Sequence, residues 1–257
     1  MLLQDFITYS NQLTELFCGD SLDILPLLPD SSVDVVFADP PYFLSNNGIS
    51  CASGRMVSVN KGKWDQGLSL EERHSFNISW ISLCYQKLKP TGTIWISGTL
   101  HNIYSIGMAL EMTGFQVINN ITWQKSNPPP NLACKTFTHS TETILWAKKR
   151  NAKKYIFNYQ TMKTLNNNKQ MKDVWTGSLT SPSEKKHGKH PTQKPEYLLN
   201  LILTSSTNVN SLVVDPFCGS GTTGVVANKL NRRFVGIDKE PDFIRLAQCR
   251  IEEVNGT

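Results

Sequence analysis

The stretch Val33-Asp-Val-Val-Phe-Ala-Asp-Pro-Pro-Tyr42 decides the fold that this sequence predicts. Its first six residues are mostly apolar and rich in valine, which is typical of a buried strand. The strand ends at Asp39, because the two prolines that follow cannot continue a hydrogen-bonded ladder. A carboxylate, a rigid turn and the ring of Tyr42 therefore lie together at the carboxyl end of a strand. Ligands bind beside such ends in open α/β sheets, so we expect a functional site here.

A second motif supports this interpretation over the alternative, a strand that prolines merely stop and that Tyr42 caps. Residues 211–223 predict a strand, a glycine-rich turn and the start of a helix, with the turn reading Asp215-Pro-Phe-Cys-Gly-Ser-Gly221. Glycines at 219 and 221 let the backbone approach a ligand closely. Asp238 ends the next strand, where an acidic residue accepts hydrogen bonds from ribose hydroxyls.

A dinucleotide-binding turn is the alternative for this second motif. Gly219, Gly221 and Gly224 match the Gly-x-Gly-x-x-Gly pattern of such turns. However, the carboxylate of Asp215 before the glycines suits a ligand that carries an ammonium group, not a pyrophosphate. The Asp-Pro-Pro-Tyr motif also has no role in hydride transfer, so the pair of motifs favours another chemistry.

Length and composition bound the class of protein. With 257 residues, 39% of them hydrophobic, the chain can form one α/β domain, and we expect a single domain over residues 1–257. A net charge of +5 permits a polyanionic partner without requiring one. No stretch approaches the about 20 apolar residues of a membrane span, and no signal peptide is evident. We therefore expect no membrane partner, and a cytoplasmic protein with reduced cysteines. His187 and His190 have no further ligands nearby in sequence, so no metal site is expected, and His190 is expected to order the loop before the second motif.

The hydrophobic pattern predicts an α/β fold with a seven-stranded, mostly parallel sheet and helices on both faces. Strands are expected at 13–20, 33–38, 93–98, 115–125, 141–149, 211–215 and 233–238. Helices are expected at 21–28, 70–88, 103–111, 196–205 and 241–253, with another that ends at Leu230, and Lys89-Pro-Thr-Gly92 is expected to stop the second of them. No helix separates the strands at 115–125 and 141–149, so this late pair is expected to be antiparallel.

Two segments lack clear periodicity. Residues 43–67 form a long polar stretch directly after the first motif, and such a loop is more often functional than not. Residues 126–190 contain a proline-rich connection and then lysines interleaved with aromatic residues. That mixture suits a nucleic-acid surface, and a solvated insertion with a small local core explains the composition about equally well.

Three motifs together resemble the amino-methyltransferases of DNA that use S-adenosylmethionine. They are Asp39-Pro-Pro-Tyr42, His190-Pro-Thr-Gln-Lys-Pro195 and Asp215-Pro-Phe-Cys-Gly-Ser-Gly-Thr222. Their order resembles the beta arrangement of this N4/N6-methyltransferase family. Further stretches, such as Phe43–Ser50, Leu100–Tyr104, Asn120–Lys125 and Val174–Ser178, look most like the DpnA-type GATC adenine methyltransferases of restriction-modification systems. The resemblance covers nearly the whole chain and implies a Rossmann-like methyltransferase fold.

The resemblance implies an adenine-specific DNA methyltransferase that moves a methyl group from S-adenosylmethionine to adenine N6 in GATC, in double-stranded and also single-stranded DNA. It further implies a restriction endonuclease with the same recognition sequence, and relatives with this motif order are often homodimers. Cytosine N4 is a chemically similar alternative target, RNA or protein amides are a third, and a catalytically silent nucleic-acid-binding module belongs to another class.

The chemistry of the first motif follows from the target. An exocyclic amine is a poor nucleophile, and Asp39 and the carbonyl of Pro40 can each accept one of its N–H bonds. Together with Pro41, they would hold its lone pair toward the methyl donor, while Tyr42 offers a ring on which an extruded base stacks.

The resemblance assigns a set of residues to the cofactor. Asp238 would bind the ribose hydroxyls, and Asp20 the adenine amino group, although Asp20 could instead be the N-cap of the helix that follows. The methionine part would be held by the turn and by two residues of the third motif: Asp215, Pro216, Phe217, Gly219, Ser220, Gly221, Thr222, Thr192 and Lys194. Residues 43–67 and 126–190 are expected to face DNA, with 126–190 as target-recognition region and contacts from Arg55, Lys61, Lys63, Lys125, Lys135 and Trp175.

Overall fold

The computed structural model of the chain describes residues 2–43, 49–52, 55–58 and 68–256, and its centre is a nine-stranded sheet. The strand order across the sheet is β1 (Ile7–Ser10), β2 (Thr14–Cys18), β11 (Arg233–Asp238), β10 (Leu212–Asp215), β3 (Val33–Ala38), β6 (Leu88–Gly98), β8 (Thr141–Lys149), β7 (Phe115–Lys125) and β9 (Val174–Gly177). All neighbours are parallel except β1 with β2, and β8 with β6 and β7. The prediction of a mostly parallel sheet with an antiparallel late pair is confirmed.

The strand count of seven was too low. The structure adds β1 and β9 at the two edges of the sheet, and a separate hairpin of β4 (Ile49–Ala52) and β5 (Arg55–Ser58). These strands have four residues each, and such short edge strands carry little hydrophobic periodicity. The stretch Lys89–Gly92 also differs from expectation, because it lies inside β6 as an irregularity in register between the Val33–Leu88 and Val35–Thr93 pairs.

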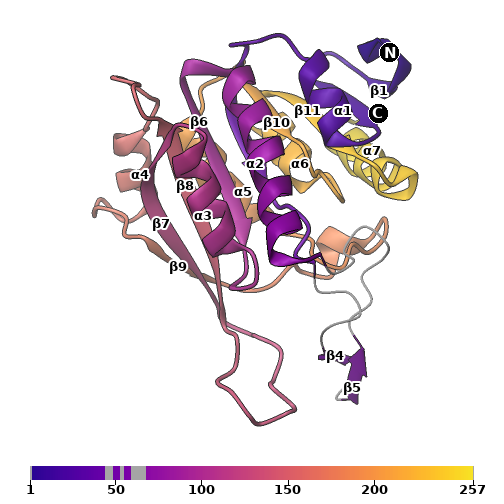
Figure 1. The fold of residues 1–257 in the computed structure, drawn as a ribbon, viewed down its shortest axis with the longest axis vertical. Coiled ribbons are helices and arrows are strands. Elements are labelled where there is room, and N and C mark those ends of the chain that lie inside the picture. The colour runs from indigo at the N-terminus through magenta and orange to yellow at the C-terminus, as the bar shows by residue number, and fades with distance from the viewer. Residues whose placement is uncertain (1, 44–48, 53–54, 59–67, 257) are drawn as a thin grey trace.

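Helices cover both faces of the sheet (Figure 1). One face packs against α1 (Ser21–Ile24), α2 (Leu70–Lys87) and α3 (Ile103–Met112), with the fully buried Trp80 among their contacts. The other face packs against α5 (Glu196–Ser206), α6 (Thr222–Lys229) and α7 (Pro241–Asn255). The described residues also form short 3-10 helices at Leu3–Asp5, Leu25–Leu27 and Ser183–Lys185, and a further helix, α4 (Tyr159–Leu165), which was not expected from the sequence.

Parallel pairing brings the two motifs together. Val35 and Val36 of β3 pair with Val213 and Val214 of β10, and β10 pairs in turn with β11. The carboxyl ends of these strands therefore meet at one edge of the sheet, although they lie far apart in sequence. Asp39 directly follows β3, and Asp215 and Asp238 end β10 and β11.

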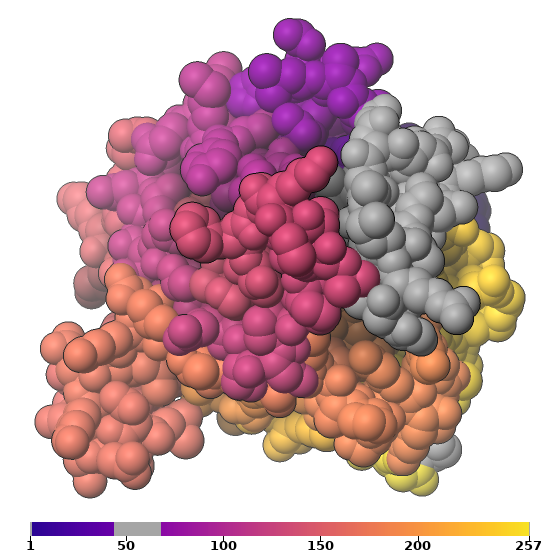
Figure 2. Space-filling view, turned by 90° about the horizontal axis from the view of Figure 1, so that it is seen from below, coloured from indigo at the N-terminus to yellow at the C-terminus, as the bar shows by residue number. Residues whose placement is uncertain are grey.

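Two described parts of the regions expected to face DNA lie at this same end of the molecule. In Figure 1 the hairpin β4–β5 and the connection between β7 and β8 both project beyond the lower end of the sheet. Figure 2 shows that end, with the β7–β8 connection at its centre and the segment that carries α4 as a separate projection. Across the described residues, we find no helix long and apolar enough to cross a membrane.

Candidate active site

A cleft of about 590 Å³, including space that is open to solvent, lies at the carboxyl ends of β2, β3, β10 and β11. Eight of the predicted site residues line it: Asp20, Asp39, Pro41, Thr192, Pro216, Phe217, Gly219 and Asp238. His190, which was expected to order the loop before the second motif, also lines the cleft. The remaining lining residues were not predicted: Gly19, Ser21, Phe76, Lys239 and Phe243.

Sequence reasoning could have found part of this second group. Gly19, Ser21 and Lys239 are sequence neighbours of the predicted Asp20 and Asp238, and this adjacency was enough to predict them as lining residues. Phe76 and Phe243 come from α2 and α7, outside every motif, and only the packing of these helices against the sheet brings their rings to the cleft.

The glycine-rich turn requires glycine for two different reasons. Gly219 and Gly221 both have positive φ, +50° and +72°, which L side chains rarely adopt. A Cβ on Gly221 would lie 2.6 Å from the Cβ of Ala247 in α7, so this glycine permits the close packing of the turn on α7. A Cβ on Gly219 would lie 3.1 Å from Nε2 of His190 and would narrow the cleft itself.

Asp215 shapes this turn from inside and does not line the cleft. Its carboxylate accepts hydrogen bonds from the backbone N–H of Phe217 at 3.0 Å and from the hydroxyl of Thr223 at 2.5 Å. Burial raises the pKa of Asp215 to about 7. Both carboxylate oxygens of Asp215 thus support the turn, and its contact with the cofactor stays a prediction.

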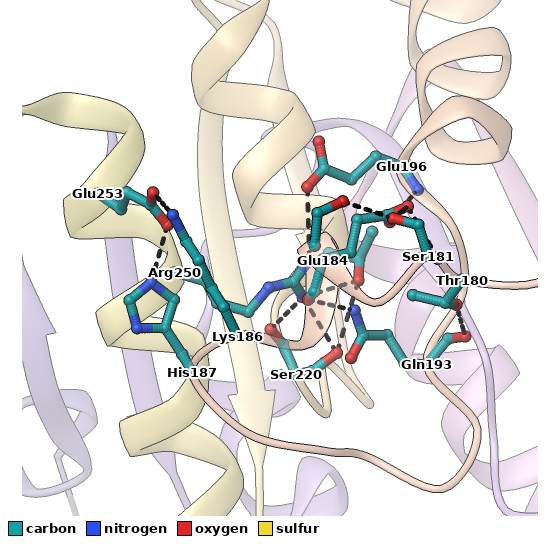
Figure 3. A network of polar contacts seen from close by, with 12 residues as sticks. Thr180, Ser181, Glu184, Lys186, His187, Gln193, Glu196, Ser220, Arg250 and Glu253 are labelled. Carbon is teal, nitrogen blue, oxygen red and sulfur yellow. Dashed lines mark hydrogen bonds and ion pairs between the residues drawn. The ribbon is translucent and has the colours of Figure 1, made fainter.

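Ser220 and Thr222 are likewise held from behind, by Arg250 of α7. The Nη1 atom of Arg250 donates to the carbonyl of Ser220 at 2.7 Å and to the hydroxyl of Thr222 at 2.9 Å (Figure 3). Its Nη2 atom lies 3.5 Å from the carboxylate of Glu196, at the start of α5. Ser220, Gly221 and Thr222 were predicted to touch the cofactor, and the structure buries them outside the cleft. Arg250 lies in no motif, so this contact could not be predicted from the sequence.

Replacing Arg250 with Met is expected to lower the free energy of unfolding by about 2–4 kcal/mol, because removal of the charged guanidinium leaves buried hydrogen-bond acceptors in the turn without a donor. Urea denaturation measures this change. The matched control is Arg245→Met, since Arg245 lies in an exposed pair with Asp242 on the same helix. The control should stay within about 0.5 kcal/mol of the unmodified chain, and an equal loss in both variants would contradict the role of Arg250.

Asp238 faces the cleft and also organises its floor. One carboxylate oxygen accepts the N–H of Gly219 at 2.8 Å, and the other accepts the N–H of Glu240 at 3.0 Å. Burial raises the pKa of Asp238 to about 6, although these two hydrogen bonds lower it. Each oxygen keeps a further lone pair for a ligand, since an ionised carboxylate accepts at about four sites.

Asp20 does what the alternative interpretation expected of it. Its side chain accepts the N–H of Leu22 at 2.8 Å and so caps α1. It also lines the cleft, so the two roles that the sequence left open are compatible in space. Ser21 beside it donates to the carbonyl of Pro216, which ties the end of β2 to the glycine-rich turn.

Asp39 lines the cleft and is bound by two other side chains. Its Oδ2 atom accepts the ammonium group of Lys194 at 2.5 Å, and its Oδ1 atom accepts the hydroxyl of Tyr42 at 2.7 Å. The same ammonium group donates to the hydroxyl of Tyr42 at 2.8 Å. Burial raises the pKa of Asp39 although Lys194 lowers it, and it raises the pKa of Tyr42 well above its ordinary value.

Two predicted roles change as a result. Lys194 was assigned to the cofactor, whereas its side chain is 6% exposed and contacts Asp39 and Tyr42. Tyr42 was assigned to base stacking, but the residue is 5% exposed and its hydroxyl serves Asp39. Its ring offers no open face to a base in this conformation. Pro40 is buried behind Asp39, and Pro41 borders the cleft, where its carbonyl accepts the side-chain amide of Asn102.

The residues predicted to touch DNA divide into three groups. Lys125 pairs with Glu142 at 2.6 Å with 12% of its side chain exposed, and Trp175 is buried beside Trp95, so neither presents a free group at the surface. Lys135 is exposed on the β7–β8 connection. Arg55 lies in β5, whose side chains are not described, and Lys61 and Lys63 lie outside the described residues.

The charge and shape of the cleft fit S-adenosylmethionine. The carboxylates of Asp20 and Asp238 face a space that only one lysine, Lys239, borders among the described lining residues, while Lys194 balances the charge of Asp39. A ligand with sulfonium and ammonium charges suits that surplus of negative charge. The missing Cβ of Gly219 leaves room that a side chain would fill, and phenylalanine rings supply apolar walls for a base.

Comparison with known protein families matches residues 33–249 to the family described as DNA methylase. The chain is 59% identical to the type II methyltransferase M2.DpnII of Streptococcus pneumoniae over 93% of its own length and 90% of that protein. It is 44% identical to the type II methyltransferase M2.MboI of Moraxella bovis over 99% of its length and 93% of that protein.

Solved structures agree on the fold. The M1.HpyAVI–SAM complex superimposes with a TM-score of 0.69 and 28% identity, and the match covers 93% of this chain and 99% of that one. The PvuII DNA methyltransferase, described as cytosine-N4-specific, superimposes with a TM-score of 0.77 and 20% identity over 98% of this chain and 93% of that one. The chain therefore belongs to the DNA methylase family and is a DNA methyltransferase.

Proposed function

We propose that the chain methylates N6 of adenine within GATC in DNA, as the modification enzyme of a restriction-modification system. S-adenosylmethionine is the methyl donor. The observation that carries the proposal is the carboxylate of Asp39 in the lining of a cleft whose other lining residues fit this donor. The names of the 59% and 44% identical type II methyltransferases support the restriction-modification setting, and the resemblance to DpnA-type enzymes supports GATC.

Cofactor binding is assigned to the residues that line the cleft. Asp238 would accept the ribose hydroxyls, while Asp20 would accept the adenine amino group. Phe217, Gly219 and Thr192 would border the methionine part, supported from behind by Asp215 and by the Arg250 contacts described above, in a space closed by aromatic rings.

Asp39 prepares the target amine. Both of its oxygens already accept one hydrogen bond, and an ionised carboxylate has about four acceptor sites, so each oxygen can accept one more. The amine donates one N–H to Asp39 and the other to the carbonyl of Pro40. These two hydrogen bonds direct the nitrogen lone pair away from both acceptors. Donation to a carboxylate also stabilises the positive charge that develops on nitrogen.

The bound donor supplies a methyl carbon on a positively charged sulfur, so that the N–C bond forms while the C–S bond breaks and its electron pair stays on sulfur. The amine nitrogen then loses one proton, to Asp39 or to water. An amine inside a duplex cannot reach a buried carboxylate, so the target base has to leave the helix. Since the ring of Tyr42 is buried, stacking of that base on Tyr42 would require the side chain to move.

The surface beside the cleft is proposed to bind DNA. We assign this role to residues 43–67 and 126–190, whose cations would contact phosphates; Lys135 is exposed, and Arg55, Lys61 and Lys63 are proposed on the sequence alone. We expect the protein to act in the cytoplasm, alongside an endonuclease with the same recognition sequence. A homodimer stays an expectation from the resemblance.

Cofactor affinity should depend on pH through Asp238. The pKa of Asp238 is about 6 in the free protein, so its carboxylate gains a proton as the pH falls below 6. The protonated carboxyl can no longer accept hydrogen bonds from both ribose hydroxyls as an anion does. Affinity should therefore rise by about tenfold between pH 5 and pH 7, because the ionised fraction of a carboxyl with a pKa of about 6 rises about tenfold over that range. Isothermal titration calorimetry measures it. Asp238→Asn should bind weakly at both pH values and lose this dependence; an unchanged slope would exclude Asp238 as its source.

The function is tested with labelled S-adenosylmethionine and oligonucleotides that contain GATC, in single- and double-stranded form. One set carries unmodified adenine, a second carries N6-methyladenine at the site, and a third has the site scrambled. Label should enter the first set alone. Incorporation that persists in the second set excludes adenine N6 at this site, and cytosine N4 then becomes the target; incorporation in the third set excludes GATC.

A further inference from the structure

Glu142 is a buried carboxylate that belongs to none of the three motifs. It is the second residue of β8, which directly follows the β7–β8 connection, and it pairs with Trp123 of β7. Its side chain is 10% exposed. A carboxylate buried to this extent is costly unless it has charged partners, so its neighbours identify its role.

The partners of Glu142 are two ammonium groups. Its Oε1 atom lies 2.6 Å from Nζ of Lys125, and its Oε2 atom lies 3.5 Å from Nζ of Lys194. Lys194 is the residue that also holds Asp39, at 2.5 Å. Asp39 and Glu142 therefore share one lysine, and with Lys125 they form a buried set of two carboxylates and two ammonium groups whose charges sum to zero.

The two carboxylates of this set differ in their environments. Burial raises the pKa of both, but for Glu142 the ammonium groups of Lys194 and Lys125 outweigh burial and lower its pKa. For Asp39 burial outweighs Lys194, and the charge of Glu142 raises the pKa further. The remaining titratable groups near Asp39 are Tyr42, which donates to it, and Asp215, whose pKa is raised in part by the charge of Asp39. Environments that separate two carboxylates in this way assign them different tasks.

We propose that Glu142 is a positioning residue for methyl transfer: it draws on the ammonium group of Lys194, so that the carboxylate of Asp39 is less tightly paired and is a stronger acceptor for the target amine. This inference rests on the proposed function. Without Glu142, Lys194 would have Asp39 as its one carboxylate partner among the described residues, and the carboxylate would be a weaker acceptor. Lys125 completes the set by neutralising Glu142.

The first measurement follows the titration of Asp39 by 13C NMR of aspartate-labelled protein without cofactor, with the signal assigned by its absence in Asp39→Asn. Removing the negative charge of Glu142 in Glu142→Gln should move the midpoint of Asp39 to lower pH. Removing the positive charge of Lys125 in Lys125→Met should move it to higher pH. The double variant restores charge balance, and its midpoint should return toward that of the unmodified chain.

The second measurement is the pH profile of kcat on the GATC oligonucleotide. In Glu142→Gln the plateau should fall by on the order of tenfold, a typical coupling between neighbouring groups, and the acidic limb should move to lower pH in step with the NMR midpoint. KM for DNA and for the donor should change little. Glu111→Gln is the matched control, because Glu111 lies in an exposed pair with Arg150, and it should leave midpoint, kcat and melting temperature unchanged.

An Asp39 midpoint that stays in place in Glu142→Gln, or a double variant whose shifts do not cancel, would overturn the proposal. Should Glu142→Gln fail to fold, Lys125→Met still decides, since an unmoved midpoint in that variant overturns it too. Failure of the proposed function is seen separately, as an unmodified enzyme that does not methylate adenine, whereas the NMR titration needs neither donor nor DNA.

Discussion

Replacing Asp39 with Asn is expected to lower kcat by on the order of 10³-fold, the largest loss of any single substitution at this site. The carboxylate is the acceptor that stabilises positive charge on the amine, and removing one such preorganised group costs about 10²–10³-fold in comparable sites. The amide has nearly the same volume and keeps one acceptor oxygen, so the loss reports charge and not shape. Single-turnover methylation of the GATC duplex measures it directly.

Binding and folding should survive this substitution. Lys194 keeps Glu142 as a counter-ion at 3.5 Å, so Asp39→Asn does not leave a buried lysine without a carboxylate. Affinity for S-adenosylmethionine should change by no more than about threefold, because most of the cleft is unaltered. Near-normal turnover in Asp39→Asn would contradict the mechanism, whereas lost turnover together with lost cofactor binding would place Asp39 in the cofactor site instead.

The position of Asp39 itself was predictable from sequence, and the reason is local. A valine-rich strand followed by two prolines specifies where the chain stops being a strand, and parallel order then places that point beside the ends of β10 and β11. Asp238 was found in the same way. Both residues line the cleft. Their positions could be predicted because strand ends, unlike side-chain directions, follow from hydrophobic pattern and chain order alone.

What sequence could not supply was the direction of the side chains within the motifs. Asp215 and Thr222 belong to the glycine-rich motif, yet they point inward, to Phe217 and Thr223 in one case and to Arg250 in the other. Arg250 lies 28 positions from Thr222 and in no motif. A motif therefore marks the segment that forms a site, and packing decides which of its members face the ligand.

The catalytic end of the cleft shows the same limit over a longer range. Lys194 was read from its motif as a cofactor residue, but 155 positions separate it from Asp39, the carboxylate that it binds. Glu142, on a third segment, carried no signal because a single glutamate at the start of a strand is common. Interactions of this kind depend on tertiary packing, which periodicity does not encode.

Replacing Lys194 with Met should be the second most damaging change, and it should act through pH. With the ammonium group gone, Asp39 and Glu142 face each other with Lys125 as their remaining cation in the described set. Loss of its main counter-ion raises the pKa of Asp39 still further, so a larger fraction of the carboxyl is protonated at a given pH and cannot accept the amine. We expect kcat at pH 7.5 to fall by on the order of 10²-fold.

The sign of the pH effect distinguishes this explanation from a general structural defect. Because the active form is the ionised carboxylate, a raised pKa moves the acidic limb of the kcat profile to higher pH, and Lys194→Met should recover activity as the pH rises toward 9. Glu142→Gln should move the same limb in the opposite direction. A structural defect lowers the plateau of both variants without moving either limb, and a limb that stays in place in Lys194→Met would contradict the assignment.

Lys87→Met is the matched control for the loss of a buried lysine. Lys87, the last residue of α2, is 5% exposed in its side chain and pairs with Asp30 at 2.6 Å. Breaking a buried pair costs about 3–5 kcal/mol, less where one partner is exposed or can take up a proton, so both variants should melt at lower temperature. Lys87→Met should nevertheless keep the kcat and the pH profile of the unmodified enzyme, because Asp30 lies outside the cleft. Loss of stability and loss of methylation then separate, and the separation assigns the effect of Lys194 to the charge that it holds against Asp39.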